Sequence, residues 1–267
     1  MQDVVVKGVG LHTGAPVTVR LRARPGAVCL RAGGVEARID ELVVASTLRA
    51  TTVEACGGGL RVGMVEHLFA ALAGLGVYDG VVIEVDGPEL PLLDGAASAW
   101  CEAVSELRLP RQTPRFRVAC DAVIDCGDSR YQLSPSDRVE VDVCLVLDDA
   151  RVTPEARWTG EADDFRTRVA PARTFALAHD FEELARLGLS RHVDPASVVV
   201  LAPDAVHCSG RPYRADEPAR HKLLDLMGDL YVHGGPPLGR VSALRPGHGA
   251  NAQAFLRARE DGAIVAR

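Results

Sequence analysis

The sequence predicts an α+β protein made of two similar halves. Short segments in which β-branched residues alternate with polar ones are bounded by glycine, a pattern typical of half-buried strands. Segments with apolar residues at helical spacing follow these strands, and the same order occurs twice along the 267 residues. Because strands precede helices in each half, the order favours α+β halves over one doubly wound parallel sheet.

The first half, residues 1–110, is expected to form an N-terminal α+β domain. Alternation is clear in segments such as Val17-Thr18-Val19-Arg20-Leu21, and Gly76 follows a stretch whose leucines and alanines recur at helical spacing. The expected elements are short strands between residues 4 and 62, a helix at 64–75, a strand at 80–85 and a helix at 98–107.

The second half, residues 115–267, is expected to form a C-terminal α+β domain on the same plan. Turn and charged residues replace periodicity at 110–114, which indicates a linker. An insertion near residues 176–202 combines a helical stretch, Gly188 and a very apolar segment, and is interpreted as a βαβ-like unit. The expected elements are strands near 116–124, 131–133, 139–147, 198–201 and 241–244, and helices near 181–187 and 219–232.

Composition excludes several classes of function. The formal charge is −6 and the 30 Lys and Arg residues are scattered, so no nucleic-acid partner is expected. No apolar run approaches the ~20 residues that span a bilayer, and no secretory leader is evident, so we expect no stable membrane insertion and a cytoplasmic location. The seven cysteines contain no Cys-x-x-Cys motif, which argues against a disulfide framework or a zinc knuckle.

The stretch of residues 220–229 carries the strongest chemical signal. His221, Asp225 and Asp229 are four residues apart, so they share one face of a helix whose other faces are mostly apolar. Such a helix belongs in a protein interior, where carboxylates and imidazoles are costly unless they are paired or bound to a metal. The spacing alone leaves both a buried His/Asp hydrogen bond and a metal site open.

Three further residues could complete a catalytic metal site. Such a site needs three protein ligands and an open position, and His67 could supply the third ligand beside His221 and Asp225. Glu66, directly before His67, suits a general base. His248 lies between two glycines in what is interpreted as a late loop, where Asp229 could orient it and raise its pKa.

Six short motifs occur along the chain in this order: Gly8-Val9-Gly10-Leu11-His12-Thr13-Gly14, Val65-Glu66-His67-Leu68, Leu92-Leu93-Asp94-Gly95, Ala172-Arg173-Thr174-Phe175, the helix at 220–229 and Gly247-His248. Together they resemble the motifs of the UDP-3-O-acyl-N-acetylglucosamine deacetylases, zinc hydrolases that commit bacteria to lipid A synthesis. The resemblance implies two sandwiched domains, each a β-sheet packed with two helices, with the helices facing one another across the active site. It also implies that the insertion forms a hydrophobic passage for an acyl chain.

The resemblance assigns roles by position. It implies that His67, His221 and Asp225 bind Zn²⁺, although two His and one Asp also suit another divalent ion such as iron. Glu66 resembles the general base, and His248, oriented by Asp229, resembles the cationic partner or general acid. The implied substrate is a UDP-linked acylated amino sugar, and a monomer is expected. The implied substrate contacts are Thr174 at the oxyanion, Lys222 near the metal and Phe175 packed on the substrate.

Some positions depart from the family pattern. Met64 and Ala96 stand where the family usually has threonine and serine, and residues 190–194 replace a Gly-Gly-Ser turn. Residues 47–52 match only loosely and receive no role. The alternatives left open are a zinc amidohydrolase acting on a different N-acyl sugar and a non-catalytic UDP-sugar or metal binder. For the protons, Glu66 alone and Glu66 with His248 both remain possible.

Overall fold

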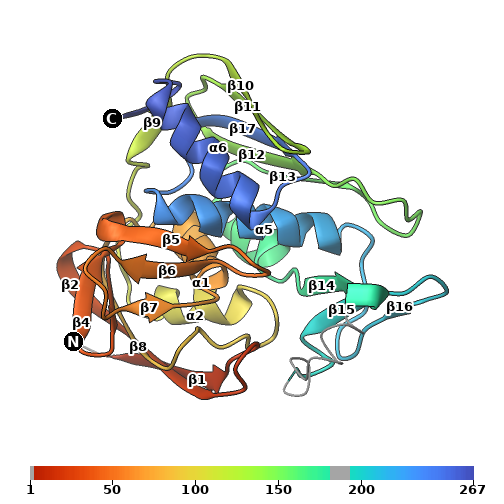
Figure 1. The fold of residues 1–267 in the computed structure, drawn as a ribbon, viewed down its shortest axis with the longest axis horizontal. Helices are drawn as coiled ribbons and strands as arrows, with labels where there is room; N and C mark the ends of the chain where they lie inside the picture. The colour runs from red at the N-terminus through yellow and green to blue at the C-terminus, as the bar shows by residue number, and fades with distance from the viewer. Residues whose placement is uncertain (1–2, 181–192) are drawn as a thin grey trace.

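The computed structural model describes residues 3–180 and 193–267. Two five-stranded sheets form the outer layers, and the long helices lie between them (Figure 1). The α+β class and the sandwiched arrangement with two long helices from each half are therefore confirmed. The division between the halves at residues 110–115 stays a prediction.

The two large sheets have the same topology. The first has the order β1-β2-β8-β3-β4 and the second β10-β11-β17-β12-β13. In each sheet the fifth strand along the chain lies in the centre, pairs in parallel with the third strand and antiparallel with the second. The repeated strand order supports the repeated plan that the sequence shows only faintly.

The elements of the first half extend to residue 106. They are β1 Val4–Val9, β2 Pro16–Ala27, β3 Cys29–Ala32, β4 Val35–Arg38, η1 Ile39–Glu41, β5 Leu42–Ser46, β6 Thr52–Ala55, β7 Arg61–Val62, α1 Glu66–Leu75, β8 Asp79–Asp86 and α2 Ser98–Glu106. Strands β5, β6 and β7 form a separate small sheet inserted between β4 and α1.

The elements of the second half begin at residue 116. They are β9 Phe116–Val118, β10 Ala122–Cys126, β11 Ser129–Ser134, β12 Val139–Cys144, β13 Glu155–Trp158, α3 Ala162–Asp164, η2 Phe165–Val169, β14 Thr174–Leu177, β15 Val198–Leu201, β16 Val206–His207, α5 Glu217–Val232, β17 Gly239–Leu244, α6 His248–Glu260 and β18 Ile264–Ala266. Strands β14 and β15 pair in parallel, as a βαβ-like insertion requires. The helix expected at 181–187 lies outside the described residues.

Two expectations about local structure were wrong. The strand expected at 116–124 is two strands, because β9 pairs with β18 whereas β10 turns away to pair with β11. The loop expected around His248 is the first turn of helix α6. The buried residues of that helix, Asn251, Ala252, Ala254, Phe255 and Ala258, do recur at helical spacing, so the signal was present.

The helices form the centre of the molecule. All ten residues of α1 are buried, because it lies between the first sheet and helix α5 (Figure 1). One hydrophobic cluster extends from the first sheet through α1 and α5 to the second sheet. Among the described residues, no helix is both long and apolar enough to cross a membrane.

Candidate active site

Helix α5 carries the polar face that the sequence predicts. Pro218 lies in its first turn, where the missing N–H of proline costs no helical hydrogen bond. His221, Asp225 and Asp229 are each 3% exposed or less. Since leucines and a methionine cover the other faces, each of these polar groups must find its partner inside the protein.

Helix α1 brings Glu66 and His67 against α5. The two helices approach closely because Gly228 has no side chain, and a Cβ atom there would lie 2.0 Å from the carbonyl oxygen of Glu66. Glu66 and His67 are 2% and 4% exposed. The predicted base and the predicted third ligand therefore meet the polar face of α5 in a buried environment.

One imidazole of the site has a fixed tautomer. The Nδ1 atom of His221 lies 3.1 Å from the carbonyl oxygen of Ala172, which can only accept a hydrogen bond, so Nδ1 carries the proton. Burial lowers the pKa of His221, which keeps the ring neutral. The lone pair of Nε2 consequently faces Asp225.

The side chains of His67, His221 and Asp225 converge. Asp225 Oδ1 lies 3.3 Å from His221 Nε2 and 3.9 Å from His67 Nε2, and one donor atom from each residue lies within 4.8 Å of the others. Asp225 Oδ1 is buried and accepts no hydrogen bond from the described residues, whereas Oδ2 accepts one from Lys222 at 2.8 Å. Acceptor atoms facing one another in a buried site repel unless a cation lies between them, so the donor set fits a divalent metal ion.

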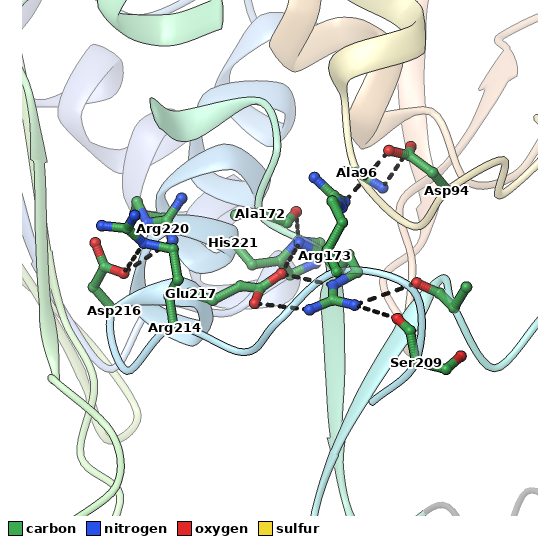
Figure 2. Close-up of polar contacts among 12 residues, drawn as sticks. Asp94, Ala96, Ala172, Arg173, Ser209, Arg214, Asp216, Glu217, Arg220 and His221 are labelled. Carbon is green, nitrogen blue, oxygen red and sulfur yellow. Dashed lines mark hydrogen bonds and ion pairs between the residues drawn. The ribbon is translucent and has the colours of Figure 1, made fainter. Parts of the chain in front are cut away.

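A buried ion pair lies beside His221, one of the predicted metal ligands, and holds the segment that contacts it (Figure 2). Arg173 is fully buried, and its guanidinium forms a bidentate pair with Glu217 in the first turn of α5, at 2.8 and 3.1 Å. The backbone N–H of Arg173 also donates to Glu217, and its Nη1 donates to the carbonyl of Ser209 at 2.9 Å. This pair fixes residues 172–174 against α5, and with them the carbonyl that orients His221.

Asp229 lies one turn further along α5 and has a different environment. Its carboxylate accepts hydrogen bonds from the Thr51 hydroxyl at 2.5 Å and from the Asn251 amide at 2.7 Å. The Nδ1 atom of His248 lies 2.9 Å from Oδ2, so the imidazole is held by the carboxylate predicted to orient it. The Tyr131 hydroxyl in turn donates to the side-chain amide oxygen Oδ1 of Asn251 at 2.5 Å.

Two titratable groups have pKa values suited to proton transfer. Burial raises the pKa of Glu66 to about 7, with the carboxylates of Asp225 and Asp229 acting in the same direction and His248 opposing. Burial disfavours the His248 cation, but the charges of Asp229, Asp225 and Glu66 and the Asp229 hydrogen bond raise the pKa of His248 to about 10. At neutral pH this places a base next to a cationic acid.

A cavity of about 240 Å³ opens onto these groups. Every predicted site residue lines it except Asp229, which lies behind His248. Lys222 and Phe175 share one wall, with the ammonium 5.8 Å from the ring centroid. The other lining residues are Leu11, His12, Arg49, Met64, Ala176, Asp180, Val193 and Val198.

The apolar segment of the insertion contributes less to the cavity than its sequence suggests. Of strand β15, only Val198 lines the cavity. Val199 and Leu201 pack instead with Val152 in a small core of the insertion's own. The replaced Gly-Gly-Ser turn lies at residues 190–194, most of which are outside the described residues.

Sequence reasoning missed the residues that support the site. Thr51 falls in the segment that received no role, and the Arg173–Glu217 pair joins positions 44 residues apart. Asn251 and Tyr131 are 120 residues apart. Arg173 had a signal in its place inside the motif at 172–175, and Asn251 shares the helical spacing of the buried residues of α6. The burial of Thr51, Glu217 and Tyr131 becomes visible only in the fold.

Comparison with known proteins agrees with this geometry. The family model described as UDP-3-O-acyl N-acetylglycosamine deacetylase matches residues 1–258. Proteins named UDP-3-O-acyl-N-acetylglucosamine deacetylase from Anaeromyxobacter sp. (strain Fw109-5) and Phenylobacterium zucineum are each 37% identical over 94% of this chain, covering 84% and 88% of their own lengths. The protein of that name from Myxococcus xanthus is 35% identical over 92% of the chain and 81% of its own length. The chain therefore belongs to the UDP-3-O-acyl-N-acetylglucosamine deacetylase family.

Proposed function

We propose that this chain hydrolyses the N-acetyl group of UDP-3-O-acyl-N-acetylglucosamine, releasing acetate and the free amine, in the pathway to lipid A. The observation that carries the proposal is the unsatisfied, buried Asp225 Oδ1 facing the Nε2 atoms of His67 and His221, with Glu66 and His248 on the same cavity. The names of the relatives indicate the substrate, and the geometry supplies groups able to carry out the reaction.

His67, His221 and Asp225 would hold the metal ion, for which we propose Zn²⁺. A bound zinc ion supplies a water of lowered pKa and polarises the acetamide carbonyl. Two further features of the chain suit this role. The Ala172 carbonyl fixes the tautomer of His221, and Lys222 holds the second oxygen of Asp225, so both ligands are oriented before a metal binds.

Glu66 would act as the general base. As water attacks the acetamide carbon, its proton passes to the Glu66 carboxylate, and the carbonyl becomes a tetrahedral oxyanion. A pKa of about 7, raised by burial, makes Glu66 basic enough to take that proton at neutral pH. Thr174 lines the cavity on the strand that carries Phe175, where its hydroxyl could donate to the oxyanion.

The second half of the reaction needs a proton at the leaving nitrogen. When the C–N bond breaks, the departing amine takes a proton either from cationic His248 or from Glu66, which then returns the proton that it took from water. Asp229 keeps His248 cationic at neutral pH in both routes, so the imidazolium opposes the negative charge of the oxyanion. Losing His248 would stop product formation in the first route and only slow it in the second.

The substrate would lie across the cavity with its acetamide at His67, His221 and Asp225. Phe175, Val193 and Val198 form an apolar part of the wall, which suits the start of an acyl chain. The Lys222 side chain is 24% exposed, and its positive charge favours a negatively charged group of the substrate, or the oxyanion, beside the proposed metal ligands.

Acetate release from UDP-N-acetylglucosamine with and without the 3-O-acyl group tests the proposal. We expect release from the acylated substrate, abolished by a chelator and restored by Zn²⁺. Release at equal rates from both substrates would contradict the requirement for an acyl chain. No release from either would contradict the deacetylase assignment.

A further inference from the structure

Thr51 bridges two groups of the active site without lining the cavity. Its backbone N–H donates to Oε2 of Glu66 at 3.0 Å, and its hydroxyl donates to Oδ1 of Asp229 at 2.5 Å. The residue is 1% exposed and immediately precedes strand β6. Its backbone carbonyl also accepts the N–H of Val65, directly before helix α1. One residue thus contacts the start of α1, the proposed base and the carboxylate behind His248.

These contacts restrict both carboxylates. Asp229 accepts hydrogen bonds from Thr51, Asn251 and His248, so each of its oxygens is engaged and rotation would break at least one bond. The backbone N–H of Thr51 is hydrogen-bonded to Glu66, and its hydroxyl is hydrogen-bonded to Asp229. Thr51 therefore fixes the position of Asp229 relative to Glu66. Glu66 is carried by α1 and Asp229 by α5, so this link also spans the two halves of the molecule.

A purely structural role for Thr51 would not require contacts with two groups of the proposed active site. The same hydroxyl could satisfy any buried acceptor at the junction of the halves, and its loss would then affect stability alone. Here the acceptor is Asp229, the carboxylate that holds His248, and the Thr51 N–H donates to Glu66, the proposed base. Displacement of Thr51 would therefore shift Glu66 directly and His248 through Asp229, and both groups act on one substrate in the proposed reaction. Errors of about 1 Å in such placement can reduce turnover by about a hundredfold.

We propose that Thr51 is a positioning residue for deacetylation, which sets the placement of the Asp229–His248 pair relative to Glu66. The inference rests on the proposed function, since it assigns Thr51 a part in that reaction. It does not involve the metal ligands directly, so zinc content should not depend on the Thr51 hydroxyl.

The test compares Thr51→Val, which removes the hydroxyl and keeps the shape, with Thr51→Ser, which keeps the hydroxyl. Thr51→Val should lower kcat about tenfold to a hundredfold with little change in KM and with full zinc content, because a buried hydrogen bond to a charged group is lost. Thr51→Ser should stay within about threefold of wild type. Thr52→Val, the neighbouring threonine in β6, is the matched control and should keep wild-type kcat.

A double-mutant cycle with Asp229→Asn separates positioning from stability. If Thr51 acts through Asp229, Thr51→Val should lower kcat by less than about threefold once Asp229 is already Asn. The same cycle, measured as the unfolding free energy of the metal-free protein, should also show coupling and gives a readout that needs no turnover.

Several outcomes would overturn the role of Thr51. The first is a wild-type kcat in Thr51→Val, and the second is a kcat as low in Thr51→Ser as in Thr51→Val. The third is a double mutant whose loss of kcat equals the product of the two single-variant losses, although the unfolding free energies of the same variants show coupling. A wild-type protein that releases no acetate would instead contradict the proposed function, and this inference would be rejected with it.

Discussion

Asp225 and Asp229 lie one turn apart on the same helix, both buried, yet their surroundings are opposite. Oδ1 of Asp225 faces two imidazole nitrogens and accepts no hydrogen bond from the described residues. Both oxygens of Asp229 are engaged, by Thr51, Asn251 and His248. One helix face can therefore serve two purposes, since a buried carboxylate oxygen without a hydrogen-bond partner suits a cation, and a fully hydrogen-bonded carboxylate holds a neighbouring side chain in place.

The charges around the two carboxylates follow the same division. Burial opposes ionisation of Asp225, but electrostatic interactions with His221, Lys222, His248 and His67 hold its pKa well below the usual range. Asp229 has His248 as its cationic partner, at 2.9 Å. The end of the polar face near residue 221 therefore suits the proposed metal ion, and the end near residue 229 keeps a proton on an imidazole.

Replacing Asp225 should have the largest effect. Asp225→Asn removes the anionic ligand, so we expect acetate release to fall by at least about ten-thousandfold, because both the activated water and the polarised carbonyl are lost. Steady-state acetate release measures this. Activity within tenfold of wild type would show that the two ends of the helix do not differ as described.

Replacing Glu66 should have the next largest effect, and it should leave the metal in place. Glu66→Ala removes the proposed base, so turnover should fall by about a thousandfold while the metal content of the purified protein stays at the wild-type level. Metal analysis alongside the assay checks both parts. A variant that loses its metal would show Glu66 to be a ligand.

Replacing Asp229 should have a smaller effect with a distinct pH signature. The Asp229 charge helps raise the pKa of His248, so Asp229→Asn should lower that pKa, and the imidazole should lose its proton at lower pH. The alkaline limb of the activity profile should therefore move to lower pH, and activity at neutral pH should fall about tenfold to a hundredfold. An alkaline limb at the wild-type position would contradict the role given to this carboxylate.

The smallest effect is expected behind His221, at the buried pair in Figure 2. Arg173→Lys cannot keep the bidentate contact with Glu217, so the Ala172 carbonyl should hold His221 less firmly and metal affinity should fall about tenfold. Competition with a chelator measures this affinity. Arg211→Lys is the control, because Arg211 and Asp94 are both exposed and their ion pair is long, at 3.5 Å. Equal losses in both variants would remove the support assigned to Arg173.

The sequence predicts the parts of the site that lie on regular elements. The four-residue spacing of His221, Asp225 and Asp229 requires only that 220–229 be helical, and Glu66 and His67 begin a helix with clear periodicity. The family resemblance then indicates that the residues on these separate elements form one site. Helix α6 shows the limit of this reasoning, because the glycines beside His248 indicated a loop although the apolar spacing behind them is helical.

The supporting residues could not be predicted, for a physical reason. Thr51 and Asp229 are 178 residues apart, and their hydrogen bond exists only because α1 and α5 pack with Gly228 at the contact. A single threonine in a loosely matching segment carries no periodicity or charge pattern that would reveal its burial. The common topology of the two sheets is likewise visible only in the strand pairing.

Metal content in a matched pair of variants tests whether the two ends of the polar face of α5 have different roles. Asp225→Asn and Asp229→Asn make the same chemical change one turn apart on one buried helix, and both can be purified and analysed side by side by elemental analysis. We expect Asp229→Asn to retain a stoichiometric divalent ion, and Zn²⁺ if the proposed metal is right, whereas Asp225→Asn should lose most of it. Equal metal content in the two variants, whether retained or lost, would contradict the division of α5 into a metal-binding end and a histidine-orienting end.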